Sequence, residues 1–437
     1  MDIAGKKVTI IGGKRSGMAL ARLVTELKGS ARISERDGED GFSRDFKDWA
    51  ARNNVAIEYN GHTRDFIEHS DLVVLSPGVR IDASPVQWAK SEDILVLGEI
   101  EFAAQFCARP IIAVTGSNGK TTVSTLITEI LRRAGYNPRL CGNVGLPFSD
   151  FVLRLKEVDY VVLEVSSFQL ESLLDPSSKF RLAEASDPLH VDGFQPYVAV
   201  ILNLNDNHLD RHRDREEYFN AKKRIFQNQD SDDHIVLNGD QPQIKELSRQ
   251  TRSRAAYFSA QSRDPLIKNP NYAAAFEVGK ILNISAQTCR EAFVEFKGVE
   301  HRLEKVRRLH GVDYINDSKA TTAQAALWAL ENIDQPILMI CGGRDKNIDF
   351  SVLAEPVQQR VKKMFVIGEA RAKIRQAFDD LISLEECEGL EEAVQKATRN
   401  ASEGDCVLLS PMCASFDMFR DFEERGRVFK DIVNRLK

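Results

Sequence analysis

The chain has 437 residues, of which 43% are hydrophobic and 28% charged, and its formal net charge is −6. This length exceeds a single hydrophobic core of about 100 to 200 residues, so the sequence predicts two or three folded domains rather than a disordered chain. The negative charge is spread along the chain without a basic block, which argues against nucleic acid as a partner.

The N-terminal stretch and the cysteines indicate the compartment. "MDIAGKKVTIIGG" lacks the apolar region and the cleavage site of a signal peptide, and no run approaches the ~18 apolar residues of a membrane span. Seven scattered cysteines without a C-x-x-C motif predict reduced, mostly buried thiols. We therefore expect a cytoplasmic protein with no membrane partner, and a monomer as the simplest state.

Short β-branched runs alternate with helical stretches along the whole chain. This pattern is typical of parallel sheets covered by helices, so we expect an α/β protein. No linker rich in Pro, Gly or Ser marks a boundary, and the distribution of motifs predicts domains at residues 1–97, 98–300 and 301–437. Many strand-like runs end in Gly, Ser, Asp or Pro, at the carboxyl ends where open α/β sheets bind their ligands.

The first block contains a glycine turn after its first strand-like run. In "IIGGKRSG", Lys14 occupies the middle position of the dinucleotide fingerprint G-x-G-x-x-G, so that fingerprint is not met. Glu35 follows Gly12 by 23 residues, a spacing that places its carboxylate to accept a hydrogen bond from a hydroxyl group. This turn and the one at "LSPGV" can equally be ordinary turns after strands.

The stretch "IIAVTGSNGKTTVSTLI", residues 111–127, is the most specific local signal. It predicts a strand, a glycine-containing loop at residues 116–119 and a helix that begins at Lys120. In such a loop the backbone N–H groups and the helix N-terminus bind phosphate oxygens, the lysine reaches the β and γ phosphates, and a Thr hydroxyl can ligate Mg²⁺. Val114 replaces the first glycine of the general motif. We expect the loop to bind a nucleoside triphosphate.

Two later runs place polar residues directly after strands. "VVLEVSSFQLE" carries Glu164, and "ILNLNDNHLDRH" carries His208 among Asn and Asp residues. Each has an ordinary structural explanation, as a helix cap or a structural histidine. Together with the phosphate loop they predict a Mg²⁺ site made of carboxylate, hydroxyl and imidazole groups.

The last block places charges in the loops after two strand-like runs. "INDSKAT" carries Asp317, Lys319 and Thr321, and "GGRDK" carries Lys346. Because unpaired charges are costly to bury, we expect these loop residues to contact a ligand.

Several motifs in a fixed order resemble the Mur ligase family over nearly the whole chain. They are "TGSNGKTT", "GNVGLP", "LEVSSFQLE", "NHLDRH", "AKKRIF", "HRLE", "INDSKAT", "GGRDK" and "SPMCASFDMFRDFEERG". The last run is similar to that of the D-glutamate-adding members. The resemblance implies three α/β domains: an N-terminal Rossmann-like domain, a central P-loop ATPase-type domain with a parallel sheet, and a C-terminal Rossmann-like domain.

The resemblance also implies an activity. The family's members join an amino acid to a UDP-N-acetylmuramoyl precursor in peptidoglycan synthesis, through an acyl phosphate made from the substrate carboxylate and ATP. For this chain the implied substrates are UDP-N-acetylmuramoyl-L-alanine, D-glutamate and ATP, with Mg²⁺ at two sites. Cations are needed because a carboxylate must attack a phosphoryl group of like charge.

By resemblance, Lys120 and Thr121 bind the phosphates and Mg²⁺, Glu164 completes the first metal site, and His208 helps to hold the second. Lys222, which looks from its spacing like a solvated helix lysine, matches the family lysine that is carried as a carbamate and supports the second metal. Lys319 is implied as catalytic, approaching the phosphate from the side opposite Arg302. The other implied ATP contacts are Gly116, Ser117, Asn118, Gly119, Thr122, Asn271 and Asp317.

The resemblance assigns the other two substrates to further residues. The implied contacts to the UDP substrate are Ser16, Glu35, Arg36, Ser76, Pro77, Gly78, Asn143, Ser166 and Gln169. The implied contacts to the amino acid are Thr321, Lys346, Ser415, Phe416 and Phe422. Both aromatic residues can equally be core residues.

Three departures from the family pattern leave alternatives open. Lys14 breaks the glycine fingerprint, Asn207 stands where the family usually has Asp, and the family's adenine segment retains at best Asn271. An insertion follows the Glu164 motif, around residues 172–195, and its Asp and His residues are expected on the surface. The alternatives are a ligase for a different amino acid and a nucleotide-binding paralogue without ligase activity.

Overall fold

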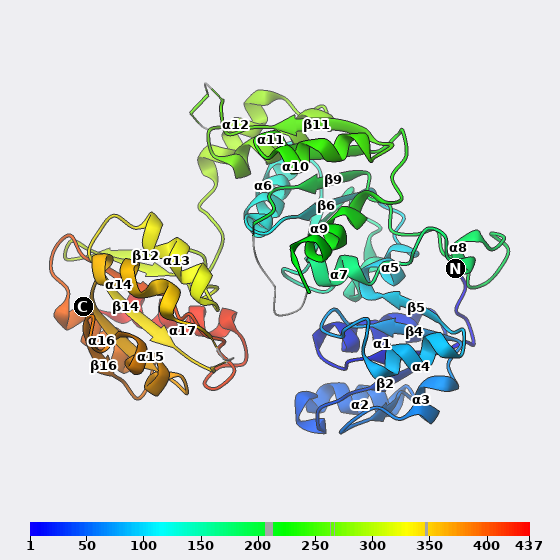
Figure 1. Cartoon of the computed structure of the whole chain (residues 1–437), viewed down its shortest axis with the longest axis horizontal. Coiled ribbons are helices and arrows are strands. Elements are labelled where there is room, and N and C mark those ends of the chain that lie inside the picture. Colours follow the sequence, from blue (N-terminus) through cyan, green and yellow to red (C-terminus); the bar gives the residue numbers. More distant parts are fainter. Residues whose placement is uncertain (206–212, 263, 266, 346–347) are drawn as a thin grey trace. The chain divides into compact units, whose positions relative to one another are not determined.

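The computed structural model describes residues 1–437 except 206–212, 263, 266 and 346–347. The chain forms two compact units, Met1–Phe296 and Lys297–Lys437, which are described separately (Figure 1). Three sheets divide between them, two in the first unit and one in the second, so the predicted α/β class is confirmed. The predicted domain bounds at 97/98 and 300/301 stay predictions. None of the described helices combines the length and the apolar character that a membrane span requires.

The N-terminal sheet of the first unit is parallel, with strand order β3-β2-β1-β4-β5. Alternate residues of its strands pack into different cores: Ile10 and Val74 into one, Ile11 and Val73 into the other. Its strands are β1 (Lys7–Ile11), β2 (Ser30–Ser34), β3 (Ala56–Glu58), β4 (Leu72–Leu75) and β5 (Leu95–Gly98). Its helices are α1 (Arg15–Glu26), α2 (Arg44–Arg52), α3 (Arg64–Glu68) and α4 (Ser84–Ser91).

The central sheet is also parallel, with strand order β11-β10-β9-β6-β8-β7. Its strands are β6 (Ile111–Thr115), β7 (Pro138–Gly142), β8 (Tyr160–Glu164), β9 (Val198–Ile201), β10 (His234–Asn238) and β11 (Arg254–Phe258). The remaining helices of this unit are α5 (Glu99–Ala104), α6 (Lys120–Arg133), α7 (Ser167–Glu171), α8 (Lys179–Leu182), α9 (Arg215–Lys223), α10 (Pro242–Lys245), α11 (Pro270–Ile281) and α12 (Ala286–Glu295).

The two faces of the central sheet carry different helices. Ile112 and Val114 of β6 pack into a core with residues of α6, α11 and α12. Ile111 and Ala113 pack into the other core, which includes Tyr218 of α9 and residues of α7. Figure 1 shows α11 and α12 on one side of this sheet and α7 and α9 on the other. Because side chains alternate along a strand, these two cores show which face of the sheet each side chain of β6 and β8 points to.

The predicted insertion, residues 172–195, forms a segment that includes α8. The side chain of Asp192 is 80% exposed, as expected, but that of His190 is only 17% exposed. The His190 ring lies 3.0 Å from the Ala183 carbonyl oxygen, within the segment itself. The segment also places Val191 and Phe194 in the core, so it is packed rather than a loose surface loop.

The second unit contains a six-stranded sheet of order β12-β13-β17-β14-β15-β16, in which only the β12–β13 pair is antiparallel. Helices α13, α14 and α15 pack on one face, and α16 and α17 on the other. The strands are β12 (Glu304–Leu309), β13 (Val312–Asn316), β14 (Ile337–Gly342), β15 (Val361–Ile367), β16 (Ser383–Glu386) and β17 (Cys406–Leu409). The helices are α13 (Ala323–Asn332), α14 (Ala354–Arg360), α15 (Arg371–Phe378), α16 (Leu390–Asn400) and α17 (Phe422–Arg435).

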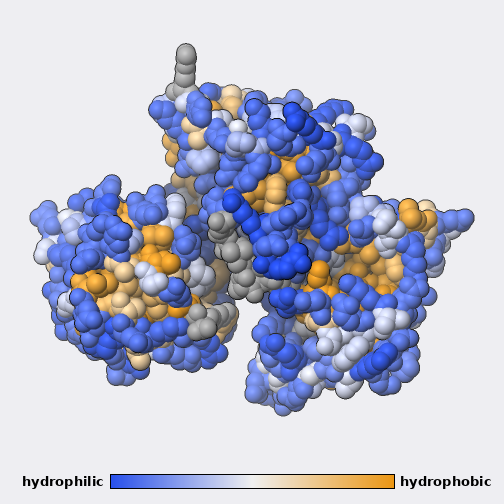
Figure 2. All heavy atoms as spheres, in the orientation of Figure 1, coloured by the Kyte–Doolittle hydropathy of each residue, from blue (hydrophilic) through white to orange (hydrophobic). Residues whose placement is uncertain are grey.

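The cysteines and the surface agree with the composition. All seven cysteines are free and six of them are buried, which confirms the expectation that most of them are core residues. Hydrophilic residues cover most of the face shown in Figure 2, and hydrophobic residues gather only in limited patches. Such a surface is typical of a folded domain in water.

Candidate active site

The predicted phosphate loop joins β6 to α6 at the carboxyl edge of the central sheet. Gly119 has a φ of 82°, in the left-handed region that favours glycine, and caps the start of α6. A Cβ atom on Gly119 would lie 2.3 Å from Oδ1 of Asn271, so the Asn271 side chain would have to shift to make room for it. The structure therefore brings Asn271, an expected ATP contact, against the phosphate loop. In the helix that follows, the five residues predicted to share an apolar face are all buried: Val123, Leu126, Ile127, Ile130 and Leu131.

Lys120 is the first residue of α6 and folds back over the loop. Its ammonium group donates hydrogen bonds to the carbonyl oxygens of Gly116, at 2.9 Å, and Ser117, at 3.1 Å. Thr121 is buried and Thr122 half-buried in the same helical turn. A cation held on the loop at a helix N-terminus is suited to bind phosphate oxygens.

Glu164 ends β8, on the strand next to the phosphate loop. Its residue pairs with Val114 in the parallel ladder, so its side chain lies on the face of the sheet that carries α6. Oε1 accepts a hydrogen bond of 2.7 Å from the Asn143 side chain. Oε2 is buried and has no hydrogen-bond partner among the described residues. A buried carboxylate oxygen left without a partner fits a metal ligand, because such an oxygen is otherwise costly to bury.

Lys222 lies on the opposite face, in α9, and is 1% exposed. Its amine donates to the Gly116 carbonyl oxygen at 3.0 Å and lies 3.4 Å from Oγ1 of Thr115. Its Nζ atom also lies 4.6 Å from the centre of the Tyr218 ring. Burial, together with the charge of Lys120, lowers the pKa of Lys222 well below its usual value. The sequence-based picture of a solvated helix lysine is therefore wrong, because the side chain ends beneath the phosphate loop.

Part of the predicted metal site lies among the residues that the structure describes. His208 lies outside the described residues. Among the residues that the structure describes, no group of three or more His, Cys, Asp or Glu side chains could hold a metal ion. Glu164, Thr121 and Lys222 are the predicted metal contacts that lie among the described residues.

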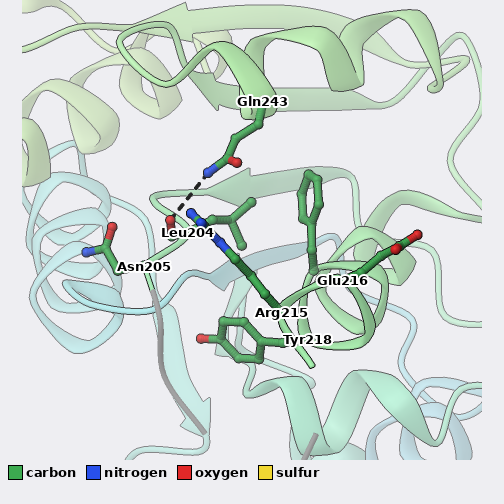
Figure 3. Close-up of a pocket in the computed structure, with 7 residues that line it drawn as sticks. Leu204, Asn205, Arg215, Glu216, Tyr218 and Gln243 are labelled. Atoms are coloured by element: carbon green, nitrogen blue, oxygen red, sulfur yellow. Dashed lines mark hydrogen bonds between the residues drawn. The ribbon is translucent and has the colours of Figure 1, made fainter. Parts of the chain in front are cut away.

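A pocket of about 280 Å³ adjoins the phosphate loop (Figure 3). The Tyr218 hydroxyl lies 3.0 Å from Oγ of Ser117, and Nε2 of Gln243 donates to the Leu204 carbonyl oxygen at 3.4 Å. The lining residues are Leu204, Asn205, Arg215, Glu216, Tyr218, Phe219 and Gln243. Tyr218 is a site residue that the motifs do not predict, although its position four residues before Lys222, on one helix face, was a usable signal.

The glycine turn of the N-terminal sheet is built around Glu35. Its carboxylate accepts hydrogen bonds from the backbone N–H groups of Gly13, at 2.5 Å, and Asp37, at 2.9 Å. A Cβ atom on Gly17 would lie 2.0 Å from the Gly12 carbonyl oxygen, so this glycine allows α1 to approach the turn. The Ser76 hydroxyl donates to the same carbonyl oxygen at 2.6 Å. The structure thus joins the two predicted turns of the first block.

The other expected contacts to the UDP substrate differ in exposure and in role. Arg36, Gly78 and Asn143 are exposed, and Ser16, Pro77 and Ser166 are half-buried. Gln169 is buried, and with Ser166 it forms a capping box at the start of α7. The Ser166 and Gln169 side chains therefore stabilise a helix end. The pattern S-x-x-Q in the sequence was a signal for this role.

In the second unit, Asp317 follows β13 and is buried. It accepts hydrogen bonds from the Leu303 N–H at 3.2 Å and the Ser410 hydroxyl at 3.1 Å. Burial raises its pKa to about 7, against the opposing charge of Arg302. Arg302 also lies 5.3 Å from the Trp328 ring centre. Asp317 and Arg302 therefore lie close enough for their charges to interact.

The expected amino-acid contacts surround the same loop of the second unit. Lys319 and Thr321 are half-buried, and the Lys319 ammonium lies 5.8 Å from the centre of the Phe422 ring. Ser415 is buried, and its carbonyl oxygen accepts hydrogen bonds from the N–H groups of the next turn. Phe416 is 55% exposed, so it is no core residue. Lys346 lies outside the described residues.

The fold and the loop together define a P-loop nucleotide-binding protein, with parallel sheets in the first unit and a third sheet in the second. Residues 114–293 match the family description "Mur ligase middle domain", and residues 301–413 match "Mur ligase, glutamate ligase domain".

Individual proteins also resemble this chain in sequence or in fold. A UDP-N-acetylmuramoylalanine–D-glutamate ligase of Pelotomaculum thermopropionicum is 38% identical over 100% of this chain and 99% of its own length. The crystal structure of UDP-N-acetylmuramate-alanine ligase from Thermotoga maritima has a TM-score of 0.57 at 18% identity, covering 99% and 100% of the two chains. A folylpolyglutamate synthase/dihydrofolate synthase from Yersinia pestis, complexed with AMPPNP and Mn, has a TM-score of 0.55 at 16% identity, covering 77% and 93%. The chain belongs to the Mur ligase family.

Proposed function

We propose that this chain is an ATP-dependent ligase that joins D-glutamate to UDP-N-acetylmuramoyl-L-alanine in peptidoglycan precursor synthesis. Curated relatives at 35–38% identity over the full chain carry this activity in their names. The observation that carries the proposal is the phosphate loop, where Lys120 and the buried Lys222 both donate to the Gly116 carbonyl oxygen. The Lys120 ammonium group, held on the loop at a helix N-terminus, favours the binding of a highly charged anion such as ATP.

The proposed reaction has two steps. The carboxylate of the UDP substrate attacks the γ-phosphorus of ATP, which releases ADP and forms an acyl phosphate. The amine of D-glutamate then attacks the acyl carbon, and inorganic phosphate leaves. In the first step Lys120 offsets negative charge that grows between the two anions.

Mg²⁺, when bound, neutralises phosphate charge and aligns the reacting groups. We propose that Thr121 and Glu164 hold one ion and that His208 contributes to a second. The unpartnered Oε2 of Glu164 supports the first assignment.

We propose further that Lys222 carries a carbamate, formed when its neutral amine adds to CO₂ and releases a proton. Burial favours the neutral amine, which is the form that reacts, and the lowered pKa of Lys222 follows from this. An anionic carbamate can support a metal ion that a free ammonium group would repel.

In the second unit, we assign Arg302, Asp317 and Lys319 to the nucleotide and its phosphates, and Thr321, Lys346, Ser415, Phe416 and Phe422 to D-glutamate. The UDP substrate is assigned to the N-terminal turn with Glu35, together with the loops of Ser76 and Asn143. Because these substrates are cytoplasmic metabolites, we propose that the protein acts in the cytoplasm. We take a monomer as its simplest state.

The test is ADP release with UDP-N-acetylmuramoyl-L-alanine and each of D-glutamate, L-glutamate, L-alanine, L-lysine and meso-diaminopimelate. We expect D-glutamate to be preferred. A preference for another amino acid would make the chain a ligase with a different acceptor. Nucleotide binding without ADP release in any of these mixtures would favour the paralogue without ligase activity.

A further inference from the structure

The phosphate loop is joined to the segment after β9 by a network of hydrogen bonds. The Ser117 N–H donates to the Asn203 carbonyl oxygen at 3.0 Å. The Asn205 N–H donates to the Ser117 hydroxyl at 2.9 Å, and that hydroxyl donates to the Asn205 carbonyl oxygen at 3.0 Å. The two segments are 85 or more residues apart in the chain but adjacent in the sheet, because β6 pairs with β9.

One side chain in this network contacts the loop in two ways. Oδ1 of Asn203 accepts a hydrogen bond of 2.8 Å from the Asn118 N–H, and Nδ2 donates one of 3.0 Å to the Asn118 carbonyl oxygen. An amide side chain can do this because it carries both a donor and an acceptor. An aspartate could only accept, and an alanine could do neither.

The contact determines which donors of the loop can reach a phosphate. The Asn118 N–H donates to the Asn203 side chain, so in this conformation it is not offered to a phosphate. The Asn118 carbonyl group, which accepts from Asn203, belongs to the peptide bond to Gly119, and Gly119 has a left-handed φ of 82°. Holding this carbonyl group therefore restrains the direction of the turn into α6.

We propose that Asn203 is a positioning residue for ATP: by holding both backbone groups of Asn118 it keeps the phosphate loop in its binding conformation. This inference rests on the proposed nucleotide-dependent function and concerns no residue assigned to the chemistry. Loss of the amide leaves the loop free to adopt other conformations, and ATP binding must then pay for its ordering.

The experiment compares Asn203→Ala and Asn203→Asp with Asn228→Asp as a matched control. Like the half-buried Asn203, the buried Asn228 uses both of its amide groups, donating to the Phe194 carbonyl oxygen at 3.0 Å and accepting from Arg181 at 2.6 Å, but its partners lie outside the loop. The measurements are ADP affinity by calorimetric titration, the KM for ATP and for D-glutamate, kcat, and the melting temperature. Titration of ADP does not require ligase activity, so the inference can fail or hold independently of the proposed function.

We expect both Asn203 variants to weaken ADP binding and to raise the KM for ATP about 10- to 100-fold, with the KM for D-glutamate within about twofold. The control variant should lose stability without this change in ATP affinity. Unchanged ADP affinity in Asn203→Ala overturns the proposal. A defect in Asn203→Asp alone also overturns it, because the added negative charge would then be the cause. Equal losses of affinity in Asn203 and Asn228 variants, at equal losses of melting temperature, would reduce Asn203 to a general structural role.

Discussion

Two glycine turns of the first unit, one after β1 and one after β6, each connect a parallel strand to a helix but offer opposite groups to a ligand. In the first turn the Glu35 carboxylate accepts the backbone N–H of Gly13, and the nearby Lys14 is exposed, paired with Asp37 at 3.3 Å. In the second, the cation Lys120 lies on the loop itself at the start of α6, and the buried Lys222 amine donates to the same Gly116 carbonyl oxygen. The first turn therefore suits a ligand with hydroxyl groups, and the second suits a polyphosphate.

A glycine spacing therefore defines a turn but not its ligand. At each turn a glycine lies where an added Cβ atom would clash, Gly17 in the first turn of α1 and Gly119 at the start of α6. What differs is the charged side chain at each turn: the Glu35 carboxylate, which follows β2, in the first case, and the Lys120 ammonium group at the start of α6 in the second.

The largest effect is expected from Lys120→Ala. Removing this ammonium group leaves the charge that develops between carboxylate and γ-phosphate without its compensation, so the rate of ADP formation should fall about 10³-fold or more. The measurement is ADP release with all substrates present, with the melting temperature as a check of folding. Lys280→Ala, which removes an exposed lysine of α11, should keep normal turnover. Normal turnover in a folded Lys120→Ala protein would remove the assignment of the loop.

Lys222→Ala should be the second most severe change, with turnover about 10²-fold lower. If the lysine acts as a carbamate, a short carboxylic acid such as acetate should restore part of the activity, because it can occupy the space of the missing anion. Lys223→Ala, the adjacent lysine of α9, is the control and should neither lose activity nor respond to acetate. Full activity of Lys222→Ala without added acid would reject the carbamate.

Much of the fold follows from sequence patterns that the structure confirms. Runs such as residues 111–115 form buried strands, and the apolar stripe of the following helix is fully buried. The position of Lys222 could not be derived from spacing, because its burial depends on β6 lying next to α9, which is a tertiary contact. The same holds for Asn203, whose partner Asn118 is 85 residues away. His208 and Lys346 stay predictions, since both lie outside the described residues.

Glu35→Gln tests the first turn and should leave the second unaffected. The new amide places an NH₂ group against one of the backbone N–H groups that the carboxylate accepts, so the turn should bind the UDP substrate less well. We expect the KM for UDP-N-acetylmuramoyl-L-alanine to rise about 10-fold, and the KM for ATP to stay within about twofold. Glu39→Gln, at an exposed carboxylate of the same domain, is the control. An equal rise in both KM values would show that the two turns are not independent.

The smallest effect on turnover is expected from Gly17→Ala, which changes packing but no ligand contact. The added Cβ atom would lie 2.0 Å from the Gly12 carbonyl oxygen and 2.9 Å from its carbonyl carbon, and backbone atoms cannot move aside as a flexible side chain can. Helix α1 must therefore shift from the turn, which should lower the free energy of unfolding by about 1–3 kcal/mol. Chemical denaturation measures this loss. Gly41→Ala, where nothing lies within 4 Å of the new atom, should change stability by no more than about 0.5 kcal/mol.

Because the phosphate loop has its own supports in β9 and α9, the kcat of Gly17→Ala at saturating substrate should stay within about twofold of the unmodified protein. A large loss of kcat in the folded variant would mean that the first turn also shapes the site of phosphoryl transfer.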